Sequence, residues 1–150
     1  MAGKISGIEI EKLSLNGEEL PFAAFIDQNG FEGDTSRAKG IIILNAEAPH
    51  YINTELGGQI LPGHLHDNIL IAGLELNISV LPAGTRLKIG RKVLFEIVSK
   101  ADHYRMMFPE LSEAILEYLE EWGGVSCRVI SGVGERICRQ QEVEILHLEK

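Results

Sequence analysis

The sequence predicts a mainly β protein that folds as a closed or nearly closed β-barrel with two peripheral α-helices. Three observations support this fold class: short apolar segments recur along the chain, glycine, asparagine and proline separate them, and only two segments have helical spacing. A sheet of many short strands leaves few exposed edges when it closes on itself. The chain has 150 residues, 45% hydrophobic and 24% charged, so we expect a single barrel domain over residues 1–150.

The strands are predicted from alternation and from apolar runs. Ile8 and Ile10 alternate with glutamates, and Asn16-Gly17 offers the positive φ angles of a two-residue hairpin turn. The run at 41–44 is apolar at every position, which is typical of a strand buried on both faces. Further strands are expected at 69–71, 87–89, 93–98, 125–130 and 143–148.

Two segments have the pattern of helices. Residues 46–56 follow Asn45, a candidate N-cap, and end at Gly57-Gly58. Residues 109–122 carry an apolar stripe, with glutamates mostly on the other faces. We interpret this second helix as covering one end of the barrel rather than as binding a partner. Its stripe consists of Leu111, Ile115, Leu119 and Trp122.

Charge and hydropathy exclude several classes of function. The chain has 14 basic and 22 acidic residues, a net charge of −8, whereas nucleic-acid-binding surfaces need clustered lysine and arginine. The longest apolar run, 40–44, is far too short to span a bilayer, and the N-terminus has no apolar segment of signal-peptide length. We therefore expect a cytoplasmic protein with no nucleic-acid partner and no membrane partner.

Glycine-containing segments in a fixed order carry a family resemblance. Gly30-Phe31-Glu32-Gly33-Asp34 comes first, Pro62-Gly63-His64-Leu65-His66-Asp67-Asn68 follows, and a hairpin signal spans 84–90. In this order and spacing the chain resembles the MOSC domain, the small β-barrel module at the end of molybdenum-cofactor sulfurases and in stand-alone bacterial proteins. The resemblance extends from about residue 5 to residue 148. It implies a MOSC-like barrel and, as cofactor, the molybdenum cofactor (molybdopterin).

The resemblance also marks where a reactive group is expected. In the family, the strand after this hairpin leads to a cysteine, which is thought to ligate molybdenum or to carry sulfur as a persulfide. Here 98–104 resembles that segment, Asp102 occupies the cysteine position and His103 follows it. A carboxylate can bind a hard cation but cannot form a persulfide. Asp102 and His103 are therefore the candidate catalytic residues, and the sequence leaves open whether the protein is an enzyme.

A ligand pocket is predicted where the loops that carry these motifs converge. A pterin with a phosphate tail has ring donors and acceptors and an anionic end, which suit carboxylate, amide and guanidinium groups. The alternative is that the same polar side chains bond to nearby backbone or lie solvated at the surface. The candidate cofactor-binding residues are Asp34, Arg37, His66, Asn68 and Arg128.

The histidines and cysteines of the chain could in principle support metal or thiol chemistry. On a strand, His64 and His66 would face one side with Asp67 nearby, but a closed site needs further ligands, so we predict no metal site. Cys127 alternates with valines and is expected in the core. Cys138 lies between two arginines, whose positive charge is typical of the surroundings of reactive cysteines, but we interpret it as a loop thiol without a role.

Two functions remain open. The first is a MOSC-like domain that binds molybdenum cofactor or a related pterin or anion, as a component of sulfur or cofactor handling with a protein partner in cofactor metabolism. The second is a non-catalytic binding or scaffold module that kept the barrel and lost the sulfur chemistry, because fold alone does not fix function.

Overall fold

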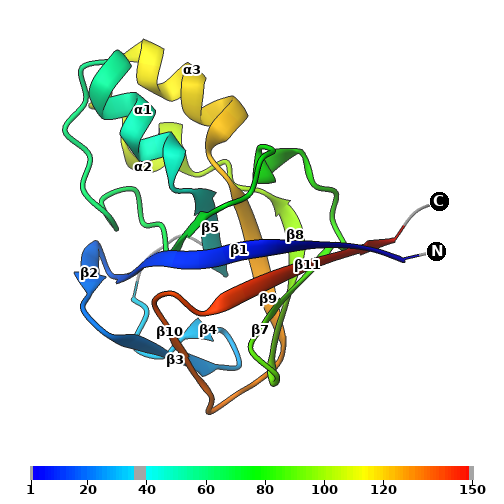
Figure 1. Ribbon diagram of the computed structural model, residues 1–150. Coiled ribbons are helices and arrows are strands. Elements are labelled where there is room, and N and C mark those ends of the chain that lie inside the picture. Colours follow the sequence, from blue (N-terminus) through cyan, green and yellow to red (C-terminus); the bar gives the residue numbers. More distant parts are fainter. Residues whose placement is uncertain (1, 36–39, 149–150) are drawn as a thin grey trace.

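The computed structural model describes residues 2–35 and 40–148, and it shows a β-barrel with helices gathered on one side (Figure 1). The strands are β1 (Ala2–Leu15), β2 (Glu18–Leu20), β3 (Ala23–Asp27), β4 (Gly30–Phe31), β5 (Ile41–Asn45), β6 (Ile69–Ala72), β7 (Arg86–Ile89), β8 (Val93–Lys100), β9 (Val125–Ser131), β10 (Arg136–Cys138) and β11 (Glu142–Leu148). The helices are α1 (Glu47–Glu55), α2 (Tyr104–Met107), α3 (Glu113–Trp122) and the 3-10 helix η1 (Ile78–Val80).

The barrel closes because its first strand pairs with its last. Hydrogen bonds join the strands in the order β11-β7-β8-β9-β5-β6-β1, and β1 then returns to β11, so the ring has no open edge. Only β5 and β6 run parallel; the other neighbours in the ring are antiparallel. The predicted closed barrel is therefore confirmed.

The long strand β1 serves several partners in succession. Its first part pairs with β11, its middle with β6 and its end with β2 across the Asn16-Gly17 turn, as predicted. The register shifts between Ile5 and Ile8, where Gly7 has a φ of 81°. This irregularity lets one strand bend around the barrel instead of running straight. A separate small sheet, β10-β3-β4, lies beside the ring.

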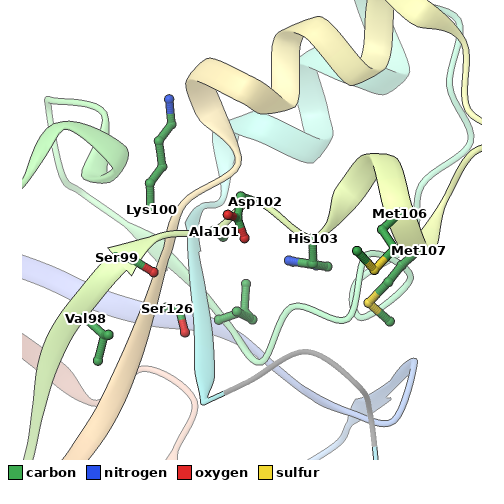
Figure 2. Close-up of a pocket in the computed structure, with 10 residues that line it drawn as sticks. Val98, Ser99, Lys100, Ala101, Asp102, His103, Met106, Met107 and Ser126 are labelled. Atoms are coloured by element: carbon green, nitrogen blue, oxygen red, sulfur yellow. The ribbon is translucent and has the colours of Figure 1, made fainter.

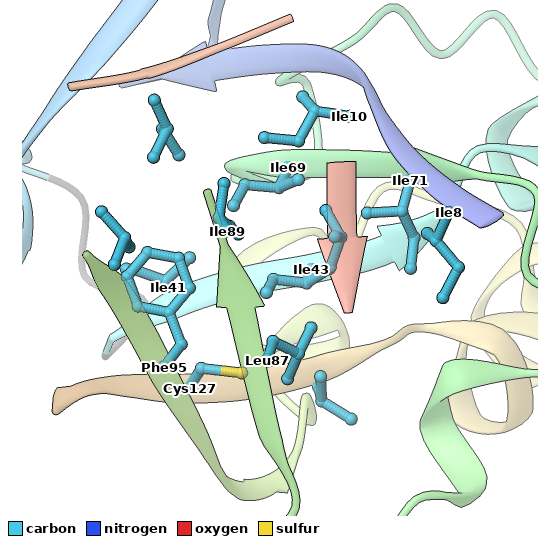
Figure 3. Close-up of a cluster of buried hydrophobic side chains, with 14 of the residues drawn as sticks. Ile8, Ile10, Ile41, Ile43, Ile69, Ile71, Leu87, Ile89, Phe95 and Cys127 are labelled. Carbon is cyan, nitrogen blue, oxygen red and sulfur yellow. The ribbon is translucent and has the colours of Figure 1, made fainter. Parts of the chain in front are cut away.

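The barrel interior is filled by alternate side chains of its strands, most of them isoleucine, leucine and valine (Figure 3). β-branched side chains pack well on a pleated surface, which explains why isoleucine recurs. The labelled members of this cluster, all buried, are Ile8, Ile10, Ile41, Ile43, Ile69, Ile71, Leu87, Ile89, Phe95 and Cys127.

A second apolar cluster, which we call the helical cap, lies between the outer face of the barrel and the three α-helices. β5 separates the two clusters: Ile41 and Ile43 belong to the barrel interior, whereas Ile42 and Leu44 belong to the cap. This confirms the prediction of a strand buried on both faces. The cap is where the helices, and the loops that lead into them, meet the barrel.

The first predicted helix is α1, but its start differs from the prediction. Asn45 does not cap it: the residue ends β5, its side-chain Oδ1 accepts from Ile78 N at 2.9 Å, and its Nδ2 donates to Leu76 O at 2.9 Å. Ala46 holds the N-cap position without a side-chain hydrogen bond. Asn45 therefore fixes η1 to the barrel rather than starting a helix.

The second predicted helix is α3, and it is shorter than expected. It begins at Glu113 because the hydroxyl of Ser112 accepts from the backbone N of Ile115, at 3.3 Å, as an N-cap does. The single turn α2 before it was not predicted. Among the described residues, no helix is long and apolar enough to cross a membrane.

Candidate functional site

A pocket of about 730 Å³ lies where β8 ends and the chain turns into α2. Residues 98–103 form one wall, and Met106 and Met107 of α2 contribute further side chains. Ile42 of β5 and Ser126 of β9 complete the lining. The segment in which the resemblance placed the family's reactive residue is thus the main wall of a cavity.

A break in strand pairing creates this wall. The register of β8 against β9 shifts between Ile97 and Ser99, and Val98, Ser99 and Lys100 are all exposed. The backbone N of Ala101 then donates to Gly124 O at 3.0 Å, which anchors the end of the strand. A β-carbon on Gly124 would lie 2.1 Å from Ile43 O, so this close approach requires glycine.

The pocket has chemically different sides. Figure 2 shows the hydroxyls of Ser99 and Ser126 on one side and the thioethers of Met106 and Met107 on the other. Asp102 lies between them, next to His103, and Lys100 points away from the other lining side chains. The pocket therefore combines an apolar surface with hydrogen-bonding groups, as small-molecule sites do.

His103 is held in a defined protonation state. Its Nε2 lies 2.9 Å from Leu65 O, and because a carbonyl only accepts, Nε2 carries the hydrogen. Burial lowers the pKa of His103 despite the opposing effect of the hydrogen bond to Leu65 O, and His66 acts in the same direction as burial, which favours the neutral ring. In the neutral ring Nδ1 is then the atom that accepts a hydrogen bond.

The loop at 63–68 holds His103 in place, because the carbonyl of Leu65 accepts the hydrogen bond from its ring. The buried carboxylate of Asp67 accepts from the backbone N of Gly63, at 3.1 Å, and of Leu65, at 3.3 Å. Burial raises the pKa of Asp67 despite these hydrogen bonds. The ring of His66 packs edge-on against Phe108 at 5.3 Å and does not line the pocket.

The strand geometry considered for a histidine metal site is wrong, because this segment is a turn. His66 has a φ of 59°, and His64 is exposed, with its Nδ1 accepting from the backbone N of Leu61 at 3.2 Å. Within residues 2–35 and 40–148, no group of three or more His, Cys, Asp or Glu side chains could hold a metal ion.

Asn68 has a structural role in this fold. Its Oδ1 accepts from Ile42 N at 3.0 Å and its Nδ2 donates to Ser14 O at 3.2 Å, while its backbone bonds the same two residues. The side chain thus joins β1 and β5 where β6 begins. The side chain of Asn68 is therefore directed at backbone groups rather than at the pocket.

Two of the remaining predicted ligand residues, Asp34 and Arg128, do not line the pocket. Asp34 is half-buried in the turn after β4, where its backbone N donates to Phe31 O at 3.1 Å. Arg128 is exposed on the outer face of β9 and pairs with Glu96 at 2.6 Å. Arg37 lies outside the described residues. Of the predicted site residues, the pocket brings together Asp102 and His103.

Sequence reasoning missed several lining residues. Ser126 neighbours the buried Cys127, so alternation alone would have placed it outward, but only strand pairing shows that it meets Ser99. Met106 and Met107 carried a weak signal, an apolar run with Phe108 in the connection between a strand and a helix. Both depend on α2, which the sequence did not reveal.

Neither thiol reaches the pocket. Cys127 points into the barrel, as predicted, and burial raises the pKa of its thiol. Cys138 is half-buried on β10, where it lines a different cavity together with Phe22 and Arg136. Because these are the two cysteines of the chain, no thiolate is present at the end of β8.

Comparison with known proteins defines the fold class. The crystal structure of the YuaD protein from Bacillus subtilis superposes with a TM-score of 0.78 over 99% of this chain and 100% of that one, at 14% identity. YiiM from Escherichia coli gives a TM-score of 0.61 over 97% of this chain and 71% of that one, at 12% identity. The crystal structure of a hypothetical protein gives 0.64, with 95% and 68% covered, at 11% identity.

These likenesses show a MOSC-like barrel fold. No family model matches the sequence, and no curated protein matches it in sequence.

Proposed function

We propose that this protein is a MOSC-like binding domain that holds a pterin-class heterocycle, molybdenum cofactor or a relative, in the pocket at the end of β8, without thiol chemistry. One observation carries the proposal. The segment in which the resemblance expects the family's reactive residue forms the main wall of a pocket with Asp102 and His103 in it.

The lining groups suit such a ligand. A pterin presents adjacent N–H donors on one ring edge, and the side chain of Asp102 offers two oxygens that can accept from them. Ser99 supplies a hydroxyl, and Nδ1 of His103 supplies an acceptor, for the remaining polar edge. Ile42 and the two methionines offer apolar and polarisable contacts to a flat ring face. The volume, about 730 Å³, falls within the usual range for small-molecule sites.

The charge of the lining residues limits how much a phosphate tail would contribute to the affinity for the ligand. Lys100 is the cation among the described lining residues, and it extends away from the rest (Figure 2). Arg128, one of the two arginines predicted for ligand binding, pairs with Glu96. A phosphate tail would therefore lie at the Lys100 end, and we expect the ring to contribute more to affinity than the phosphate.

The scaffold alternative has its own support. Asn68 and Arg128, two residues that the resemblance suggested for ligand binding, are taken up by contacts within the protein. A module that kept the barrel while its ligand contacts became structural would look the same at these positions. Ligand titration distinguishes the two functions.

The test is a titration of the purified protein with fluorescent pterins, with and without a phosphate tail. We expect saturable binding to the wild type and a loss of about tenfold in affinity for Asp102→Asn, because a hydrogen bond to a charged acceptor is replaced. Glu142→Gln, an exposed carboxylate change on β11, should bind like the wild type. Absence of saturable binding by folded wild type would overturn the proposal and favour the scaffold.

A further inference from the structure

A row of stacked aromatic rings lies on the surface of the helical cap, away from the pocket just described. The rings of Tyr51 on α1 and Tyr118 on α3 stack with centroids 4.7 Å apart and an interplanar angle of 16°. Trp122, one turn further along α3, lies parallel to Tyr118 at 6.2 Å and 8°. A shallow cavity of about 380 Å³ is lined by these rings together with Glu47 and Glu121.

The rings are not simply the buried face of α3. That helix buries Ile115, Leu116 and Leu119 against the cap, whereas Tyr118 and Trp122 remain half-buried and Tyr51 is 44% exposed. Large aromatic side chains that keep exposed ring surface are enriched at sites that bind partners.

The charged side chains that α1 and α3 carry are acidic. Neither α1 nor α3 contains a lysine or arginine, and Glu47, Glu117 and Glu121 have no ion pair among the described residues. Arg105 neutralises two other glutamates of α3, Glu113 and Glu120. Two of these glutamates without an ion pair, Glu47 and Glu121, line the cavity together with the rings, in a protein that carries a net charge of −8.

Ring faces and carboxylates attract the same kind of group. The face of a tyrosine or tryptophan ring has a negative quadrupole that attracts cations, and nearby carboxylates strengthen this attraction. Burial raises the pKa of Tyr118 to about 12, and Tyr51 and the negative charge of Glu47 act in the same direction. The site thus disfavours a further negative charge.

We propose that the face formed by Glu47, Tyr51, Tyr118, Glu121 and Trp122 is a docking surface for a basic segment of a partner protein, with an arginine side chain laid against the rings. Arginine fits better than lysine because its planar guanidinium stacks on aromatic rings while it pairs with carboxylates. The cavity is shallow, and exposed glutamates such as Glu117 continue along α3 beyond it, which favours an extended segment over a small molecule. This inference is independent of pterin binding, since the two sites share no lining residue.

The chain offers a direct readout, because Trp122 is its only tryptophan and lies in the proposed site. The probe is a short synthetic peptide alternating arginine with glycine, added to the full chain at low salt. We expect the arginine peptide to change the tryptophan fluorescence saturably and to bind more weakly at high salt than at low salt. A matched peptide with lysine in place of arginine should bind more weakly than the arginine peptide.

Variants separate charge from ring contributions. The double substitution Glu47→Gln, Glu121→Gln and the single substitution Tyr118→Leu should each weaken binding by about threefold or more. Glu142→Gln on β11 is the matched control and should leave affinity unchanged. Circular dichroism on each variant confirms that it is folded.

Several outcomes would overturn the proposal: no saturable signal at low salt, equal loss in the Glu142→Gln control, or equal binding of a glutamate peptide. Saturation by free arginine amide at the affinity of the peptide would also overturn it, because a small organic cation would then be the ligand.

Discussion

The barrel interior and the helical cap differ in the kinds of side chain that they bury. The barrel interior is an almost wholly apolar cluster whose backbone groups are satisfied by the closed ring of strands. The cap combines an apolar cluster with buried polar groups, among them the Asp67 carboxylate and the hydroxyl of Tyr104, which donates to Gly123 O at 2.6 Å. We therefore expect the barrel interior to contribute most of the stability. We expect the functional site where loops leave the barrel next to the helices.

The largest effect is expected inside the barrel. Phe95 is fully buried there, and Phe95→Ala should lower the free energy of unfolding by about 3–5 kcal/mol through lost burial and a residual cavity. Met106 on the pocket rim is 87% exposed, and Met106→Ala should change the free energy of unfolding by less than about 0.5 kcal/mol. Urea denaturation measures both. Equal losses would contradict the division into a structural barrel and a functional cap.

A smaller loss is expected for a polar contact of the cap. Tyr104→Phe removes the hydroxyl that donates to Gly123 O and leaves a buried carbonyl without that partner. We expect a loss of about 1–3 kcal/mol in the free energy of unfolding. A neutral result in the same denaturation assay would show that the cap, like the barrel, depends on apolar packing alone.

The pH dependence of stability should also distinguish the cap. Because burial raises the pKa of Asp67 above its ordinary value of 3.8, its contribution to stability is present below that value and is lost as pH rises through the folded-state pKa. Asp67→Asn should therefore gain on the wild type as pH rises from about 4 towards neutrality. Denaturation curves across this range test it. A constant difference between the two proteins would contradict a raised pKa.

Thiol reactivity compares the pocket with the barrel interior. The substitution Asp102→Cys should change stability little, because Asp102 is exposed. In a Cys138→Ser background, a cysteine introduced by Asp102→Cys should react quickly with iodoacetamide, whereas Cys127 in the barrel should stay protected until unfolding. Mass spectrometry identifies the alkylated residue. Alkylation of Cys127 in the folded protein would show that the barrel interior opens.

The two regions also differ in what the sequence revealed. Alternation at Ile8 and Ile10 predicted a barrel strand correctly, because successive side chains of a strand point to opposite faces of the sheet. The apolar run at 41–44 predicted a strand correctly for a different reason, because that strand is buried on both faces. The structure of the helical cap depends on contacts between residues that are far apart in the sequence. The register shift between Ile97 and Ser99 decides which side chains line the pocket, and no local pattern encodes it.

The predicted site residues show the same limit. The resemblance indicated Asp102 and His103, which follow a strand that the sequence predicts, and both line the pocket. Asn68 and Arg128 could not be assigned, because their partners Ser14 and Glu96 are distant in sequence. From the sequence alone, a polar side chain that binds a ligand cannot be distinguished from one that forms a structural hydrogen bond. The distinction requires the pairing of the strands.

The most direct test of the central claim, that the pocket at the end of β8 is the ligand site, is amide chemical-shift mapping of the full chain during titration with a pterin. We expect saturable shifts in residues 98–107 and at Ser126, smaller shifts in the loop at 63–68 that contacts His103, and unchanged signals from the inner residues of β7 and β11. Saturable shifts confined to the cavity around Phe22 and Cys138, or none at all, would contradict the account.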